Sequence, residues 1–152
     1  MDRKFYSVHT SNKSIFERIW RQFRELFEES VQMRLMSDVP LGIFLSGGLD
    51  SSAIAATMAK QMDDPLMTFS VGFESKYYSE FSYAREVAKA IGANHHEVEL
   101  RAAEVIASIP MLIWHEDKPI RNASSIALYH VARLAQDHVK VVLTGEGSDE
   151  LF

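Results

Sequence analysis

The stretch from Leu41 to Ala59 constrains the fold more than any other part of the chain. A short apolar run, Leu41 to Leu45, is typical of a buried strand, and it stops in the turn Ser46-Gly47-Gly48. A run compatible with a helix starts at Asp50, directly after this turn. A strand, a glycine turn and a helix N-terminus in this order form an anion site, because unpaired backbone N–H groups and the helix dipole favour negative charge. The stretch therefore predicts a phosphate-binding loop.

The residues around the turn indicate which kind of phosphate this loop binds. The hydroxyls of Ser46, Ser51 and Ser52 add hydrogen-bond donors. A Walker A loop has a lysine followed by serine or threonine after its last glycine, and this chain has Leu49-Asp50 there. A carboxylate beside a phosphate repels it unless a divalent cation lies between them. We therefore expect a magnesium-bound polyphosphate; the alternative is a plain β–α turn with an aspartate cap.

Composition excludes several classes of protein. The net charge of -5, with no basic block to compensate, argues against nucleic acid as the main partner. The longest apolar runs are too short to cross a membrane, and no secretory signal opens the sequence. Cysteine is absent, which excludes disulfides, thiolate metal sites and a cysteine nucleophile. We expect a cytoplasmic protein with neither a nucleic-acid nor a membrane partner.

The N-terminal region divides into two parts. Residues 1–13 lack periodicity and are interpreted as a flexible lead-in, whereas residues 14–152 are interpreted as one domain. From Ser14 to Met36, apolar residues recur every three or four positions and predict an amphipathic helix: Phe16, Trp20, Phe23, Phe27, Val31 and Leu35. We interpret this aromatic stripe as core that packs on a sheet. If part of it were exposed, it would promote self-association, so a homodimer is also predicted.

Strands and helices alternate along the rest of the chain. Apolar or alternating runs predict strands at 41–45, 66–73, 95–100 and 139–143, and helices are predicted at 50–59, 80–91, 102–114 and 124–136. The alternation predicts an α/β fold, a doubly wound parallel sheet with helices on both faces and strand order 3-2-1-4. In such a sheet the ligand lies beyond the carboxyl ends of the strands. His95 and His96 point to opposite faces of their strand, which argues against a joint metal site.

A second glycine-rich loop, Thr144 to Glu150, follows the fourth predicted strand and should meet the first loop at the same edge of the sheet. Its glycines are one short of a dinucleotide fingerprint, so nicotinamide binding is a poor fit. It carries carboxylates at Glu146, Asp149 and Glu150. Asp50 and Asp149 could share a magnesium ion with phosphate oxygens and waters. The alternative is a solvated acidic turn. The position of this loop opposite the phosphate loop favours the functional interpretation.

These two loops resemble a known family. Ser46-Gly47-Gly48-Leu49-Asp50-Ser51-Ser52 is similar to the pyrophosphatase loop (PP-loop) of the N-type ATP pyrophosphatases. Combined with the stretch from Thr144 to Phe152, it resembles the synthetase domain of the glutamine-hydrolysing asparagine synthetases. The likeness runs from about residue 14 to the end and includes Thr68-Phe69-Ser70-Val71-Gly72-Phe73 and His95-His96-Glu97-Val98. It implies an adenine nucleotide alpha-hydrolase-like fold.

The resemblance also implies a two-step reaction that uses ATP and Mg²⁺. A substrate carboxylate attacks the α-phosphate to give an acyl-adenylate and pyrophosphate, and ammonia then displaces AMP. By this similarity, pyrophosphate is held by Ser46, Gly47, Gly48, Ser51 and Ser52, and magnesium by Asp50 and Asp149. Adenosine is framed by Leu45, Val71, Thr144 and Gly145. Glu146 matches the catalytic glutamate, which orients the intermediate and takes a proton from the incoming ammonium.

The same resemblance suggests the partners of the reaction. The acceptor is a small carboxylate, with the side chain of aspartate as the first choice. Ammonia would come from a glutaminase domain with an N-terminal cysteine; this sequence has no cysteine, so we interpret it as a truncated part of a longer protein. Two alternatives stay open: a related enzyme that closes an amide in another acceptor, such as a β-lactam or a peptide ring, and an ATP-binding module without turnover.

Overall fold

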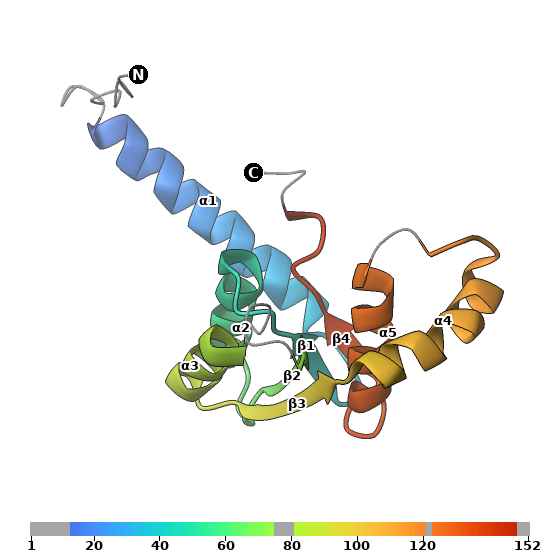
Figure 1. The fold of residues 1–152 in the computed structure, drawn as a ribbon. Coiled ribbons are helices and arrows are strands. Elements are labelled where there is room, and N and C mark those ends of the chain that lie inside the picture. The colour runs from blue at the N-terminus through green and yellow to red at the C-terminus, as the bar shows by residue number, and fades with distance from the viewer. Residues whose placement is uncertain (1–12, 75–80, 121–122, 149–152) are drawn as a thin grey trace, which may run out of the picture.

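The computed structural model describes residues 13–74, 81–120 and 123–148 (Figure 1). Within these ranges, helices and strands alternate after an initial helix. Their order is α1 (Lys13–Arg34), β1 (Leu41–Phe44), α2 (Leu49–Gln61), β2 (Met67–Phe73), α3 (Phe81–Ile91), β3 (Asn94–Leu100), α4 (Ala102–Glu116), α5 (Ala123–Ala135) and β4 (Val141–Leu143). Each predicted element is present. The predicted lead-in, up to residue 12, lies outside the described residues, and the first helix begins at Lys13.

The four strands form one parallel sheet in the order β3-β2-β1-β4, which confirms the predicted strand order. Gly42 of β1 lies opposite both Met67 of β2 and Val142 of β4. A Cβ atom at Gly42 would come within 2.7 Å of the carbonyl oxygen of Met67, so only glycine fits this close pair of strands. Because the strands are parallel, the carboxyl ends of β1, β2 and β4 lie at one edge of the sheet, where the predicted loops begin.

Helices cover both faces of the sheet and give it two hydrophobic cores. On one face, Ile43 and Leu45 pack with Ala55 and Met58 of α2 and with Ala84 of α3. The opposite face is centred on Phe69 of β2 and is covered by α5, with a core formed by Phe69, Val131, Ala135 and Val139. Side chains of β1 and β2 point alternately into one core and the other, as in strands that helices cover on both faces.

The interpretation of the first helix as core is wrong for most of its length. Phe16 is 64% exposed and Trp20 is 52% exposed, and Phe23 also reaches solvent. The reason is the direction of α1: its C-terminal part lies beside α2, where Val31 is buried and Phe27 packs against the core, while its N-terminal part projects away from the sheet (Figure 1). The exposed rings stack along the helix, with centroids 5.8 Å apart for Trp20 and Phe23. The homodimer expected from such a surface stays a prediction.

No helix in the described ranges is long and apolar enough to cross a membrane. The cytoplasmic location expected from the sequence stays a prediction. Most elements differ by one or two residues from the predicted boundaries at one or both ends. Helix α4 continues to Glu116, two residues further than expected, and the residue after it, Asp117, caps it in the left-handed conformation (φ 52°). Strand β4 begins at Val141, and the N–H of Lys140, just before it, donates to the carbonyl of Pro40 at 2.9 Å.

The adjacent histidines of β3 point to opposite faces of the sheet, as expected. His95 bonds Thr68 on the side that α3 covers, whereas His96 stacks on Phe69, with ring centroids 5.5 Å apart, on the side of α5. The ring of His138 lies 4.0 Å from that of His96 and also contacts Phe69. Burial lowers the pKa of His96 below its usual value of 6.5, and the neighbouring charges of His138 and His95 lower it further.

This arrangement predicts that the chain loses stability in mild acid. A histidine whose pKa is lowered by folding binds fewer protons in the folded state, so its contribution to stability is present above the unfolded pKa, about 6.5, and is lost as the pH falls below it. We expect the free energy of unfolding in urea to decline from pH 7.5 toward pH 5.5, and His96→Gln to flatten this decline. His115→Gln, at an exposed position of α4, is the control. An equal slope in wild type and His96→Gln would contradict the assignment.

Candidate functional site

A cavity of about 810 Å³ opens at the edge of the sheet where β1, β2 and β4 end. One wall is formed by the loop that follows β1, another by β2 and its end, a third by the first turns of α5, and the last by the loop that follows β4. Its lining residues are mostly apolar or carry hydroxyls: Phe44, Leu45, Ser46, Gly48, Asp50, Ser51, Phe69, Ser70, Val71, Phe73, Ser124, Ser125, Ala127, Leu128, Val131, Thr144, Gly145 and Glu146. An elongated ligand with polar and apolar parts suits such a lining.

The phosphate loop, residues 46–52, folds around the N-terminus of α2. Gly48 caps the helix in an extended conformation (φ -69°, ψ 166°), and its N–H donates to the hydroxyl of Ser46 at 3.2 Å. The hydroxyls of Ser46 and Ser51 lie 3.0 Å apart, and Ser51 is 5% exposed. The first N–H groups of a helix have no carbonyl one turn earlier to accept their hydrogen bonds. This end of α2 therefore presents backbone donors and two hydroxyls to the cavity.

The described part of the acidic loop, residues 144–148, approaches the phosphate loop so closely that glycine is required at position 145. A Cβ atom on Gly145 would lie 2.9 Å from the backbone nitrogen of Ser51 and 3.4 Å from the carbonyl carbon of Asp50. Ser148 closes the turn, because its hydroxyl donates to the carbonyl of Gly145 at 2.8 Å. Glu146, on the same turn, is exposed and lines the cavity. The two loops thus meet across the N-terminus of α2.

The structure brings most of the predicted site residues to this one cavity. Nine of them line it: Leu45, Ser46, Gly48, Asp50, Ser51, Val71, Thr144, Gly145 and Glu146. Gly47 lies on the other side of the loop, against α3. Ser52 does not line the cavity either, and its hydroxyl donates to the carbonyl of Gly48 at 2.6 Å. Asp149 and Glu150 lie outside the described residues.

Sequence reasoning missed the wall that α5 contributes. Ser124, Ser125 and Leu128 line the cavity opposite the phosphate loop, although no glycine turn or charged motif marks them. The pair of serines at the start of a predicted helix was the available signal, but serine is common there for capping alone. Phe73 also lines the cavity, from the end of β2, whereas the sequence pattern predicts only that it belongs to a strand.

Asp50 lies in the phosphate loop and has the right chemistry to hold a divalent cation in this cavity. It is the second residue of α2 and lines the cavity beside the hydroxyl of Ser51. The described ranges contain no group of three or more histidine, cysteine or acidic residues placed to bind a metal ion. Magnesium nonetheless fits such a place, because it commonly takes one or two carboxylates and completes its shell with phosphate oxygens and waters.

Solved structures with a similar fold use the same type of sheet. The NMN synthetase from Francisella tularensis matches with a TM-score of 0.56 and 15% sequence identity, over 80% of this chain and 52% of that one. The NH3-dependent NAD synthetase from Campylobacter jejuni matches with a TM-score of 0.59 and 12% identity, over 87% of this chain and 58% of that one. At this level of identity the comparison establishes the fold alone, which this chain shares with both synthetases.

Sequence comparison identifies the family. The asparagine synthase family model matches residues 22–152. "Asparagine synthetase [glutamine-hydrolyzing] 1" of Bacillus subtilis is 42% identical over 136 residues, which cover 90% of this chain and 21% of that protein. The mouse asparagine synthetase [glutamine-hydrolyzing] is 34% identical over 164 aligned residues, which cover 99% of this chain and 29% of that protein. The chain thus spans between a fifth and a third of these relatives, and it belongs to the asparagine synthase family.

Proposed function

We propose that this chain forms the ATP-using part of an amide-forming ligase that releases AMP and pyrophosphate. The observation that carries the proposal is the meeting of two strand-end loops over the N-terminus of α2, with Gly145 packed against the backbone of Ser51 and Glu146 on the same cavity. A helix N-terminus with added hydroxyls suits a polyphosphate. An acid on the facing loop suits a reaction at the phosphate nearest the nucleoside. Membership of the asparagine synthase family supports this pairing.

The first half-reaction needs a site that stabilises a leaving anion. When a carboxylate oxygen attacks the α-phosphorus of ATP, the bond to the β-phosphate breaks and negative charge grows on the departing pyrophosphate. Backbone donors at the start of α2 and the hydroxyls of Ser46 and Ser51 are placed to accept that charge. Their mutual hydrogen bond, 3.0 Å long, holds both hydroxyls in place before ligand arrives. This preorganisation lowers the cost of stabilising the charge.

The nucleoside part of ATP has an apolar place beside this anion site. Leu45 is fully buried at the end of β1 and Val71 is half-buried in β2, and both line the cavity next to Thr144 and Gly145 of the facing loop. We infer that these residues frame the adenosine, so that the α-phosphate lies between the phosphate loop and Glu146. We infer that the hydroxyls on the first turn of α5, from Ser124 and Ser125, face the acceptor side.

Asp50 would hold Mg²⁺ in this scheme, together with Asp149. The ion, when bound, supplies positive charge that neutralises the pyrophosphate. The sequence itself gives the reason: Asp50 follows a glycine turn at the place where a carboxylate without a cation would repel phosphate. Asp50→Asn removes the negative ligand and should therefore weaken the dependence of ATP binding on magnesium.

In the second half-reaction ammonia attacks the acyl carbon and AMP leaves. Glu146 would take the proton that the attacking nitrogen must lose. Its carboxylate is exposed at the cavity, within the turn that Ser148 closes, so an ammonium ion can reach it. Aspartate as acceptor is proposed from the relatives, which are called asparagine synthetases [glutamine-hydrolyzing]. Ammonia is the nucleophile proposed for this half-reaction.

The products of ATP turnover test this function. In a protein that contains the whole chain, ATP, aspartate and ammonia with magnesium should yield AMP and pyrophosphate in equal amounts with asparagine. The nucleotide products can be separated by anion-exchange chromatography. ADP and phosphate would contradict the proposal, because they require attack at the γ-phosphate. Magnesium-dependent ATP binding without any pyrophosphate release would instead favour a binding module without turnover.

A further inference from the structure

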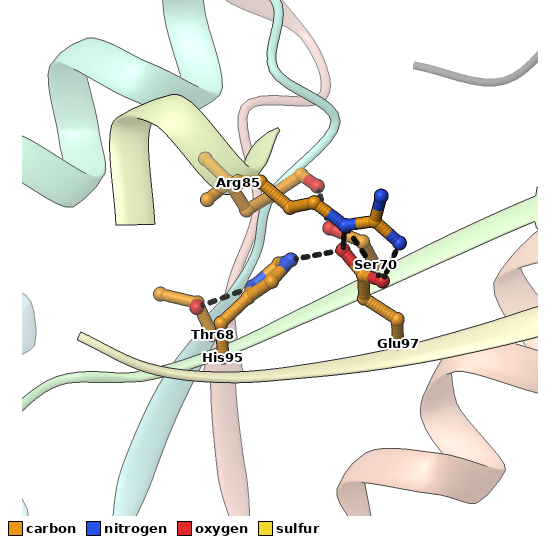
Figure 2. Close-up of polar contacts among 6 residues, drawn as sticks. Thr68, Ser70, Arg85, His95 and Glu97 are labelled. Atoms are coloured by element: carbon orange, nitrogen blue, oxygen red, sulfur yellow. Dashed lines mark hydrogen bonds and ion pairs between the residues drawn. The ribbon is translucent and has the colours of Figure 1, made fainter. Parts of the chain in front are cut away.

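A row of polar contacts joins β2, β3 and α3 on the side of the sheet that α3 covers (Figure 2). The hydroxyl of buried Thr68 lies 2.8 Å from Nδ1 of His95, and Nε2 of His95 lies 3.0 Å from Oε1 of Glu97. Arg85 of α3 also binds Glu97 through hydrogen bonds: its Nε donates to Oε1 at 2.9 Å and its Nη2 donates to Oε2 at 2.6 Å. The described residues that line the cavity include none of these four.

Every member of this row has a compatible proton arrangement. An ionised carboxylate can only accept hydrogen bonds, so Glu97 accepts from Arg85 and from Nε2–H of His95. In the neutral ring Nδ1 is then the acceptor, and the hydroxyl of Thr68 donates to it. The side chain of Glu97 is 21% exposed and that of Arg85 is 63% exposed. The pair is distinguished from an ordinary surface ion pair by its geometry, because two N–H groups of the guanidinium bond the two carboxylate oxygens.

The helix that Arg85 belongs to forms the back wall of the phosphate loop. Gly47 has a positive φ of 82°, and a Cβ atom there would lie 2.7 Å from the backbone nitrogen of Ala84 and 2.7 Å from Cβ of Tyr83. The start of α3 is also fixed by the sheet. The ring of Phe81 packs so closely on β2 that a Cβ atom on Gly72 would come within 2.6 Å of it. At Gly47 the loop is too close to α3 to admit a side chain, so we expect a shift of the start of α3 to move the loop.

We propose that Glu97 is a positioning residue for the phosphate loop, acting through Arg85 and the first turn of α3. Glu97 stands on β3, two strands away from the loop, and reaches α3 one turn beyond Phe81. Phe81 fixes where α3 begins, and the Arg85–Glu97 pair fixes how the helix is rotated over the sheet. The guanidinium lies 5.4 Å from the centre of the Phe81 ring, so the two attachments support each other. Together they hold Ala84 against Gly47.

Amide hydrogen exchange tests this inference without any ligand. In Glu97→Gln, the amides of Gly48 and Ser52, which donate to Ser46 and to the carbonyl of Gly48, should exchange about tenfold faster than in wild type. Amides of α5 should keep their rates. Glu116→Gln is the matched control, since Glu116, the last residue of α4, is 25% exposed and pairs with Lys118 at 3.9 Å, away from α3. Unchanged rates in the loop, or an equal rise throughout the chain, would overturn the inference.

A double-mutant cycle tests the proposed route through Arg85. Arg85→Met alone should raise loop exchange as much as Glu97→Gln does, and the double variant should show no further rise, because both changes remove one contact. Additive effects would show that Glu97 acts on the loop by another path and would overturn the role given to Arg85.

The effect on ligand binding rests on the proposed function and is measured separately, with inorganic pyrophosphate and magnesium in a calorimeter. Glu97→Gln should weaken pyrophosphate binding about tenfold, in line with the exchange result, while Glu116→Gln binds like wild type. Faster loop exchange with unchanged pyrophosphate affinity would overturn the positioning role. Faster exchange in a chain whose wild type binds no pyrophosphate would instead contradict the proposed function and leave the mechanical link between Glu97 and the loop supported.

Discussion

Replacing Glu146 with glutamine is expected to lower amide formation by about 10²–10⁴-fold, the range for loss of a general base. Glutamine keeps the size and polarity of the side chain but cannot take a proton from the attacking nitrogen. Because Glu146 lies on the loop that faces the phosphate loop, and is not part of it, ATP affinity should change by less than about twofold. Single-turnover formation of asparagine and calorimetric binding of ATP give the two quantities.

Glu86→Gln is the control for this change, because Glu86 is an exposed glutamate on α3. It should leave both quantities unaltered. Equal losses of ATP binding and amide formation in Glu146→Gln would contradict the role of a proton acceptor and would indicate that Glu146 contributes to nucleotide binding. Full activity in the variant would remove Glu146 from the mechanism.

Gly47→Ala is expected to abolish most nucleotide binding and to destabilise the chain. The added methyl group meets the backbone of α3 at 2.7 Å, and the positive φ of 82° costs a non-glycine residue about 1–2 kcal/mol before any clash is counted. To relieve the contact, the loop must move toward the cavity and carry Ser46 and Gly48 with it. We expect at least a tenfold loss of ATP affinity by calorimetry and a lower midpoint of thermal unfolding.

Gly92→Ala separates strain from clash. Gly92 also has a positive φ, 67°, but nothing lies within 4 Å of a Cβ atom there. That variant should lose about 1–2 kcal/mol of stability and keep its ATP affinity. If Gly47→Ala bound ATP as tightly as Gly92→Ala, the prediction would be contradicted, because the close packing of the phosphate loop on α3 would then not affect ATP binding.

Much of the fold could be predicted from hydrophobic periodicity. The apolar runs of β1, β2 and β4 and the amphipathic pattern of α3 specify their structures locally, and alternation of strands and helices then limits the topology to a parallel sheet. Helix α1 shows where this reasoning stops. Periodicity gives the apolar face of a helix but not the partner of that face. Trp20 belongs to the same stripe as Val31, yet one is exposed and the other is buried.

The site was predictable where chemistry is concentrated in a short motif. The serines and glycines of residues 46–51 and the turn that carries Glu146 can be identified because glycine turns at strand ends have a defined geometry. The wall that Ser124 and Leu128 form could not be identified, since it depends on how α5 lies across β2. The side-chain direction of Ser52 depends equally on a local competition, in which its hydroxyl prefers the carbonyl of Gly48.

The most direct test of the proposed reaction follows one oxygen atom. Aspartate labelled with 18O in its side-chain carboxylate is incubated with ATP, ammonia, magnesium and a protein that contains this chain, and the AMP is examined by mass spectrometry. If the carboxylate attacks the α-phosphate, AMP acquires one labelled oxygen for each asparagine formed, because the oxygen that joins carbon to phosphorus leaves with the phosphate. Asparagine formed together with unlabelled AMP would contradict the acyl-adenylate and, with it, the role proposed for the cavity between the two loops.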